Sequence, residues 1–482
     1  MNDVKKAVMT TWRWVMCAML FFATTVNYMD RQVLSLTFKE FIQPEFHWTD
    51  SDYGTITGVF SIAYAIFCLF AGKFIDWMGT KKGYLIAIVV WSLGAVLHAG
   101  CGFVTEHIVG LESKQALLEA SGAIVSTISM VSVWLFLACR LILGLGEAGN
   151  FPAAIKVTAE YFPKKDRAFA TALFNAGASV GALAAPATIP LLAKSLGWEW
   201  AFIIIGALGF IWAGIWIFVY DKPTESKHVN AAELEYIQQD DAETTNDKSQ
   251  ITNEKQMSFA EAFKHKQTWS FAFGKFMTDG VWWFFLFWAP AYFQDQYGIK
   301  ASDPQGIALI FTLYAIVTVI SLFGGYLPKI FVEKRGMEPY AGRMRAMLIF
   351  AFFPLFALFA QPLGGVYGPW AVAIIIGIVG AAHQSWSANI FSTTGDMFPK
   401  SAVATITGIG AMAGGVGSFL INKGSGMLFD HAAGLGEAFR FVGFTGKPAG
   451  YMIIFCICAV AYLIGWTVMK TLVPKHQPVV ID

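Results

Sequence analysis

Stretches of about 20 consecutive apolar residues recur from one end of the chain to the other, and each is long enough to cross a lipid bilayer as a helix. Hydrophobic residues make up 56% of the 482 residues and charged residues only 14%. A soluble protein would carry about 25% charged residues. Because lipid cannot satisfy open backbone groups, helices are the spanning structure that suits such runs. The sequence therefore predicts an all-α membrane protein.

The apolar runs predict twelve transmembrane helices, which we place at about 13–36, 52–76, 83–104, 126–149, 168–193, 199–220, 268–293, 305–331, 343–362, 368–394, 402–429 and 449–471. The distribution of lysine and arginine predicts their orientation. With the long central loop left out, the loops on the side of both termini carry 18 of these residues and the opposite loops carry seven. Positive charge accumulates on the cytoplasmic side of membrane proteins, so we expect both termini in the cytoplasm.

A polar segment divides the predicted helices into two sets of six. We expect an N-terminal six-helix half at 1–220, a cytoplasmic linker at 221–267 and a C-terminal six-helix half at 268–482. The linker is polar and has no long apolar run, which is typical of a flexible connection. Short surface helices are expected at 231–239 and 258–266, and another at 112–120 in the long loop between the third and fourth spans.

Composition and spacing argue against several other classes of protein. A net charge of +1 gives no indication of nucleic-acid binding. The six cysteines fall in or beside apolar segments without disulfide or zinc spacing. The chain has no phosphate-binding Walker loop, no metal-ligand cluster and no catalytic set. We therefore expect no enzyme activity, no metal and no resident cofactor.

Ionisable residues lie inside several of the apolar segments. Arg140 and Glu147 are seven residues apart, so they lie on one helix face about 10 Å apart along the axis. Asp30 and Arg31 form a second pair in the first span. Charges at bilayer depth usually face a partner or a wet cavity. Either pair could instead be a fixed structural ion pair, and Lys275 and Asp279 have the i, i+4 spacing of a pair across one turn.

The loop after the second span reads Gly72-Lys73-Phe74-Ile75-Asp76-Trp77-Met78-Gly79-Thr80-Lys81-Lys82. It closely resembles the signature loop of the major facilitator superfamily. The matching segment of the second half, Gly324 to Gly336, is degenerate and has no aspartate at that place. The resemblance implies two pseudosymmetric six-helix halves, the major facilitator fold. It also implies that Asp76, Lys81 and Lys82 belong to a cytoplasmic gate.

A finer resemblance is to the anion:cation symporter family, which moves organic anions with protons or sodium. It is carried by Asn27 to Arg31 and by Arg140 to Pro152. The segments 274–283 and 383–389 resemble the hexuronate-transporter branch. This resemblance implies that Glu147 is a second protonation site beside Asp30, with Arg140 adjusting its proton affinity. Ala178 departs from aldonate-transporting relatives, which have a glutamine near that position.

The substrate site is expected to gather around Arg31, whose five fixed donors suit a carboxylate. Polar and aromatic residues in apolar helices are further candidates, because amides suit hydroxyls and rings stack on sugars. The candidate substrate-binding residues are Arg31, Tyr28, Tyr64, Asn175, Trp283, His383, Gln384, Trp386 and Asn389. His383 could equally be a hydrogen-bonded packing residue.

Together, these observations predict a secondary active transporter of a bacterial cytoplasmic (inner) membrane. We expect a monomer in contact with membrane lipid that carries a small sugar acid, a hexuronate such as glucuronate or galacturonate, into the cytoplasm with a proton. The alternatives are symport of an aldonate or another organic anion with protons or sodium, an organic-anion antiporter, and a sensor that does not transport.

Overall fold

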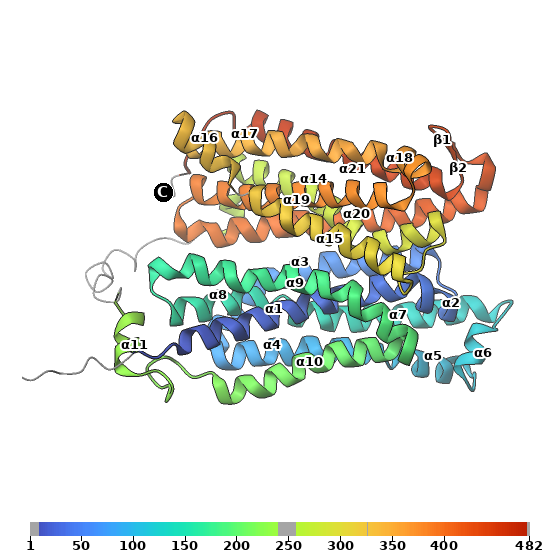
Figure 1. Cartoon of the computed structure of the whole chain (residues 1–482), viewed down its shortest axis with the longest axis horizontal. Coiled ribbons are helices and arrows are strands. Elements are labelled where there is room, and N and C mark those ends of the chain that lie inside the picture. The colour runs from blue at the N-terminus through green and yellow to red at the C-terminus, as the bar shows by residue number, and fades with distance from the viewer. Residues whose placement is uncertain (1–8, 240–256, 325, 480–482) are drawn as a thin grey trace, which may run out of the picture.

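Long helices account for most of the computed structural model, which describes residues 9–239, 257–324 and 326–479. In the N-terminal half they form a layer coloured blue to green in Figure 1, and both ends of the described chain lie at the same end of the bundle. We call this the terminal end and the opposite one the far end. The helices of this half are α1 (Trp12–Thr37), α2 (Gln43–Phe46), α3 (Asp50–Met78), α4 (Thr80–His98), α5 (Cys101–Val109), α6 (Lys114–Leu118), α7 (Ile124–Glu147), α8 (Asn150–Tyr161), α9 (Lys164–Leu196) and α10 (Trp198–Val219).

The C-terminal half forms the second layer, yellow to red in Figure 1. After α11 (Ala231–Ile237) and α13 (Phe259–Ala262) in the connecting segment, its elements are α14 (Lys266–Tyr297), α15 (Pro304–Gly324), α16 (Leu327–Arg335), α17 (Pro339–Phe352), α18 (Ala360–Tyr367), α19 (Pro369–Met397), α20 (Lys400–Leu435), the strands β1 (Arg440–Phe441) and β2 (Phe444–Thr445), and α21 (Lys447–Leu472).

Among the described residues, helices lie at each of the twelve predicted spans, so the predicted fold class is confirmed. Within the described residues, ten helical runs combine the length and the apolarity needed to cross a membrane. The other two spans are α1 and α14, with 26 and 32 residues. Polar residues lower the mean hydropathy of these two helices. They include Asp30 and Arg31 in α1 and Lys275 and Asp279 in α14. Both of these helices carry candidate site residues, among them Arg31 in α1 and Trp283 in α14.

Several elements depart from simple straight helices. Helices α7 and α8 form one helical run of 38 residues. A π-helical turn at Phe38–Ile42 follows α1, and a 3-10 segment at Phe353–Phe359 containing Pro354 joins α17 to α18. The strands β1 and β2 pair as an antiparallel hairpin whose turn has positive φ at Val442 and Gly443.

The predicted minor helices are only partly right. The helix at 231–239 is confirmed as Ala231–Ile237, where the Asn230 side chain caps the Glu233 amide. The helix expected at 112–120 is only Lys114–Leu118, because Ser113 serves as its N-cap. At 258–266 only Phe259–Ala262 is helical, and α14 already starts at Lys266. Part of the predicted linker, 240–256, lies outside the described residues, and the division into 1–220, 221–267 and 268–482 stays a prediction.

Two glycines bring α4 and α7 into backbone contact. A Cβ atom at Gly146 would lie 2.3 Å from the backbone nitrogen of Trp91, and one at Gly94 would lie 2.4 Å from that of Leu143. Small residues permit such close approach of membrane helices. The contact fixes Trp91 of α4 against α7 and so positions its side chain in the interior of this half.

We predict that Gly146→Ala lowers the thermal stability of the protein. The added methyl group must push α4 away from α7, and overpacking of this kind costs about 1–3 kcal/mol. Gly214→Ala in α10 is the matched control, because a Cβ atom there meets no atom within 4 Å, and this exchange removes a cost of about 0.5–1 kcal/mol for glycine within a helix. Thermal unfolding in detergent measures both variants. Equal melting temperatures for the two would contradict the backbone contact.

Candidate functional site

Arg31 of α1 and Glu147 of α7 form a buried ion pair between the two helices. Arg31 donates to Oε2 of Glu147 from Nη2 over 2.7 Å and from Nε over 3.1 Å. Only 6% of the Arg31 side chain and none of the Glu147 side chain is exposed. Glu147 therefore meets a neighbouring helix and not Arg140 of its own helix, as expected from the spacing of seven. Each of these charges depends on the other, since an unpaired charge at this depth is costly.

Three aromatic rings surround the guanidinium group of Arg31. Its central carbon lies 4.6 Å from the ring centre of Tyr64, 5.4 Å from that of Tyr28 and 5.1 Å from that of Trp283. Tyr28 and Tyr64 belong to the N-terminal half, whereas Trp283 lies on α14 of the C-terminal half. Arg31 thus lies where the two halves meet, in surroundings that combine one cation with ring faces.

Asp30 points to a different neighbour from Arg31. Its Oδ2 accepts a hydrogen bond of 2.8 Å from the indole nitrogen of Trp91 on α4. Consecutive helix residues point about 100° apart, so the two charges need not pair with each other. The sequence reasoning did not anticipate Trp91, because nothing in its own surroundings distinguishes it from a packing tryptophan.

The interior next to this pair contains polar atoms that no protein group satisfies. Within the part of the chain that the structure describes, these buried atoms have no hydrogen-bond partner: Oδ1 of Asp30, Oε1 of Glu147, both amide atoms of Asn27 and all three nitrogens of the Arg140 guanidinium. Arg140 instead lies over the ring of Phe60, 5.4 Å from its centre. A buried polar group without a partner costs about 1–3 kcal/mol. These groups therefore retain unused capacity to bind protons or polar ligands.

The contacts of His383 and Trp386, two of the predicted candidates on α19, lie within the C-terminal half. His383 is buried, its Nδ1 lies 2.7 Å from the hydroxyl of Tyr462, and its ring stacks on Trp282. Trp386 is also buried and meets Tyr462 edge to face. These contacts match the packing alternative for His383.

Asn389 and Gln384 lie elsewhere on the same helix. The amide of Asn389 donates to the Ser385 carbonyl oxygen over 2.8 Å. Asn389 also lines a hollow of about 370 Å³ within the C-terminal half, together with Lys329 and Arg343. Gln384 is half-buried on α19.

Two further groups of polar residues lie on α9 and α14. Asn175 is an exposed residue of α9. Lys275 and Asp279 pair with each other over 2.8 Å, one turn apart on α14. The i, i+4 pairing expected from their spacing is thus present.

The signature loop lies at the terminal end, and the contacts of its charges stay on the N-terminal side of the molecule. Asp76 pairs with Lys156 of α8 over 2.7 Å, although most of its side chain is exposed. Lys81 pairs with Asp221 over 2.8 Å, and Lys82 is exposed. Within the described ranges, no ion pair of these three residues reaches the C-terminal half.

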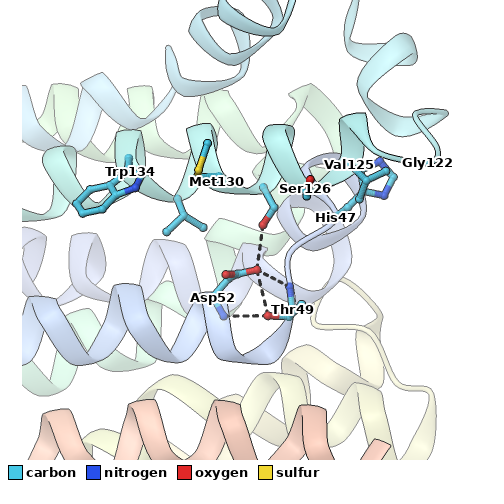
Figure 2. A pocket seen from close by; sticks show the side chains of 10 residues that line it. His47, Thr49, Asp52, Gly122, Val125, Ser126, Met130 and Trp134 are labelled. Carbon is cyan, nitrogen blue, oxygen red and sulfur yellow. Dashed lines mark hydrogen bonds between the residues drawn. The ribbon is translucent and has the colours of Figure 1, made fainter. Parts of the chain in front are cut away.

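A surface hollow of about 530 Å³ lies at the far end between the start of α3 and α7 (Figure 2). Asp52 is its acidic residue, and its Oδ2 accepts hydrogen bonds from Ser129 and from the backbone and side chain of Thr49. The bond from the Thr49 backbone belongs to the capping box that starts α3. The carboxylate is therefore already occupied by a structural role, and this hollow is separate from the Arg31 site.

The far end also holds contacts between the halves that the sequence analysis missed. Lys39 and Asp50 of the N-terminal half form ion pairs with Asp295 and Lys447 of the C-terminal half. At the sequence level each of these residues is only a polar residue at the end of an apolar run. Their proximity depends on the packing of four helix ends that are far apart in the chain.

Comparisons with known proteins agree with this fold. The family model described as Major Facilitator Superfamily matches residues 20–421 of the chain. The chain is 28% identical to the hexuronate transporter of Escherichia coli K12, covering 95% of this chain and 94% of the relative. It is also 28% identical to the galacturonate transporter of Dickeya chrysanthemi, covering 66% and 82%. Among solved structures, a D-xylose–proton symporter has a TM-score of 0.68 at 15% identity, covering 97% of this chain and 100% of that chain.

The family match and the transporter relatives, together with the membrane-spanning helices of the described residues, identify a membrane transport protein and not an enzyme. The chain belongs to the major facilitator superfamily, and it is an integral membrane protein.

We predict that the single variants Arg31→Leu and Glu147→Leu are each less stable than the double variant carrying both changes. Removing one partner of a buried pair leaves an unpaired charge and costs about 3–5 kcal/mol, whereas removing both leaves none. Thermal unfolding of the parent and the three variants in detergent measures the coupling between the two residues. Glu333→Ala is the control, because the Lys329–Glu333 pair is exposed and should shift the melting temperature little. A double variant with the summed loss of both singles would contradict the pairing.

Proposed function

We propose that this protein is a proton-coupled symporter that carries a sugar acid, most specifically a hexuronate, into the cytoplasm. The observation that carries the proposal is the Arg31–Glu147 pair. Arg31 is a buried cation surrounded by ring faces, which suits a substrate with one carboxylate and a sugar ring. Its present partner is an acid that can be neutralised by a proton. The names of two relatives, a hexuronate transporter and a galacturonate transporter, support the same substrate class.

The pairing suggests how proton and substrate binding are linked. While Glu147 is ionised it occupies Arg31, so a substrate carboxylate must compete with it for the same donors. A proton on Glu147 removes that competition, and Arg31 is then left with a charge that the substrate can compensate. Proton binding and substrate binding therefore favour each other, as coupled transport requires.

The membrane potential makes this coupling useful. A negative interior opposes entry of an anion by about 2.3 kcal/mol per charge per 100 mV. One proton on Glu147 would cancel the charge of a monocarboxylate. A second on Asp30, whose Oδ1 has no protein partner within the described residues, would turn the potential into a driving force.

The orientation of the protein is part of the proposal. The bias of lysine and arginine toward the loops at the terminal end supports a bacterial cytoplasmic membrane with both termini inside. We predict activity for a carboxyl-terminal fusion to a reporter that functions only in the cytoplasm. A fusion to an enzyme that functions only outside the membrane should be silent, and the opposite pattern would reverse the assignment.

The substrate class is tested by uptake into proteoliposomes. We expect glucuronate and galacturonate to compete with labelled hexuronate more strongly than aldonates, and dicarboxylates to compete least, because the Arg31 site offers one cation. Arg31→Ala should weaken binding by about 2–5 kcal/mol, which is at least about 30-fold. Competition by dicarboxylates alone would overturn the substrate assignment, and binding without counterflow would indicate a sensor.

The coupling is tested with variants that imitate protonated acids. Glu147→Gln and Asp30→Asn should lose accumulation driven by a pH gradient but retain counterflow, because the substrate can still reach Arg31. Glu199→Gln is the control, since this acid pairs with Lys114 away from the site. Parent-like accumulation by both variants would show that neither acid carries the coupling proton, and dependence on sodium would identify a different coupling ion.

A further inference from the structure

Four charged side chains from the two halves meet at the far end and form a closed ring of alternating sign. Lys39 pairs with Asp50 over 3.1 Å and with Asp295 over 3.0 Å. Lys447 pairs with the same two acids, lying 2.6 Å from Asp295 and in contact with Asp50. At most 17% of any of these side chains is exposed. We call these four residues the far-end ring.

The ring divides into two neutral pairs along the boundary between the halves. Lys39 and Asp50 both belong to the N-terminal half, and Asp295 and Lys447 both belong to the C-terminal half. Separation of the halves would break the contacts Lys39–Asp295 and Asp50–Lys447 but leave one ion pair within each half. No charge of the far-end ring would lose its last partner, so separation avoids the large penalty of an unpaired buried charge at these four residues.

In the C-terminal half, both charges of the ring lie at helix ends where the helix dipole opposes them. Asp295 lies in the last turn of α14, and Lys447 is the first residue of α21. An acid at a helix C-terminus and a base at an N-terminus both oppose the helix dipole. Asp50 lies in the first turn of α3, where the helix dipole favours an acidic residue. The unfavourable placement in α14 and α21 is offset by the ion pair that these two residues form with each other and by their contacts with the charges of the other half.

A second contact at the far end follows the same pattern. The carboxylate of Asp430 on α20 accepts hydrogen bonds from the backbone nitrogens of Asp50 and Ser51, over 2.9 and 2.7 Å, and so caps α3 from the other half. Helix α3 also has its own capping box, formed by Thr49 and Asp52. Loss of the Asp430 contact would therefore leave α3 capped.

We propose that the far-end ring is the outer gate of the transporter, and that the gate opens by giving up the two ion pairs of the ring that cross between the halves while each half keeps its own. A longer contact of 4.0 Å between Glu40 and Lys300 also crosses the boundary at this end and lies outside the ring. The inference rests on the proposed function in requiring the halves to separate at the far end and in placing that end outside the cytoplasm. It holds for any substrate and any coupling ion.

The test reverses the charges of one half. In the variant Asp295→Lys with Lys447→Asp, the pair within the C-terminal half persists, but both contacts between the halves become repulsive. The reversal also places both charges favourably for the dipoles of α14 and α21, so this half should remain folded. We expect the far end to open. The four-residue variant that adds Lys39→Asp and Asp50→Lys restores attraction across the boundary and should close it again.

Distances between spin labels in proteoliposomes, without substrate or gradient, report the state of the gate. The labels are attached to Ser126→Cys and His431→Cys at the far end and, in a separate sample, to Lys165→Cys and Lys334→Cys at the terminal end. All four positions are exposed, and the native cysteines are replaced. In the two-residue variant, the far-end distance should lengthen and the terminal-end distance should shorten. Because the readout needs no transport, it is independent of whether the substrate assignment succeeds.

The matched control is Lys114→Gln, which removes an ion cluster at the far end that lies wholly within the N-terminal half. Its distances should equal those of the parent. A two-residue variant with parent-like distances, or a four-residue variant as open as the two-residue variant, would overturn the proposal. If the charge reversal prevents folding, Lys39→Gln with Lys447→Gln leaves two facing acids and should also open the far end. Parent-like distances in that variant would overturn the proposal as well.

Discussion

The buried ion pair between Arg31 and Glu147 is the interaction on which the rest of the molecule depends. Its two charges are tolerated in an apolar helix bundle because they neutralise each other and because α1 and α7 hold them 2.7 Å apart. The glycine contact of α4 with α7 fixes the same region from the other side and positions Trp91 on Asp30. The packing of this half thus serves to keep a small set of charges in defined positions.

The charged residues inside the helices are of two kinds, and the Arg31–Glu147 pair belongs to the second. The Lys275–Asp279 pair satisfies itself within one turn of α14, so it needs nothing from neighbouring helices. Arg31, Glu147 and Arg140 depend on other helices or have nitrogens and oxygens that the described protein groups leave unsatisfied. A group that is not satisfied within its own helix is the one that can change partner, and change of partner is the elementary step of a coupled carrier.

The sequence predicted the helices well because the length and apolarity of a single segment are enough to predict a spanning helix. It also located Arg31 and Glu147, because an ionised residue in an apolar run is conspicuous. It could not pair them, since the partner depends on how α1 and α7 are rotated against each other. His383 and Asn389 show the same limit: one contacts Tyr462 and the other lies near Lys329 and Arg343, so a shared sequence segment does not make a shared site. Lys39, Asp50, Asp295 and Lys447 could not be found at all, because each is an ordinary loop-flanking charge until four helix ends meet.

Of the three rings around Arg31, only that of Trp283 comes from the C-terminal half. A ring at this distance from a guanidinium contributes about 0.5–2 kcal/mol. Any movement of one half against the other changes this contribution while Tyr28 and Tyr64 travel with Arg31. If Arg31 binds the substrate anion as proposed, its affinity for the anion then differs between the two sides of the membrane by a factor of about 2 to 30. The half-saturating concentrations on the two sides would be unequal, while the gradients alone would still set the direction of net transport.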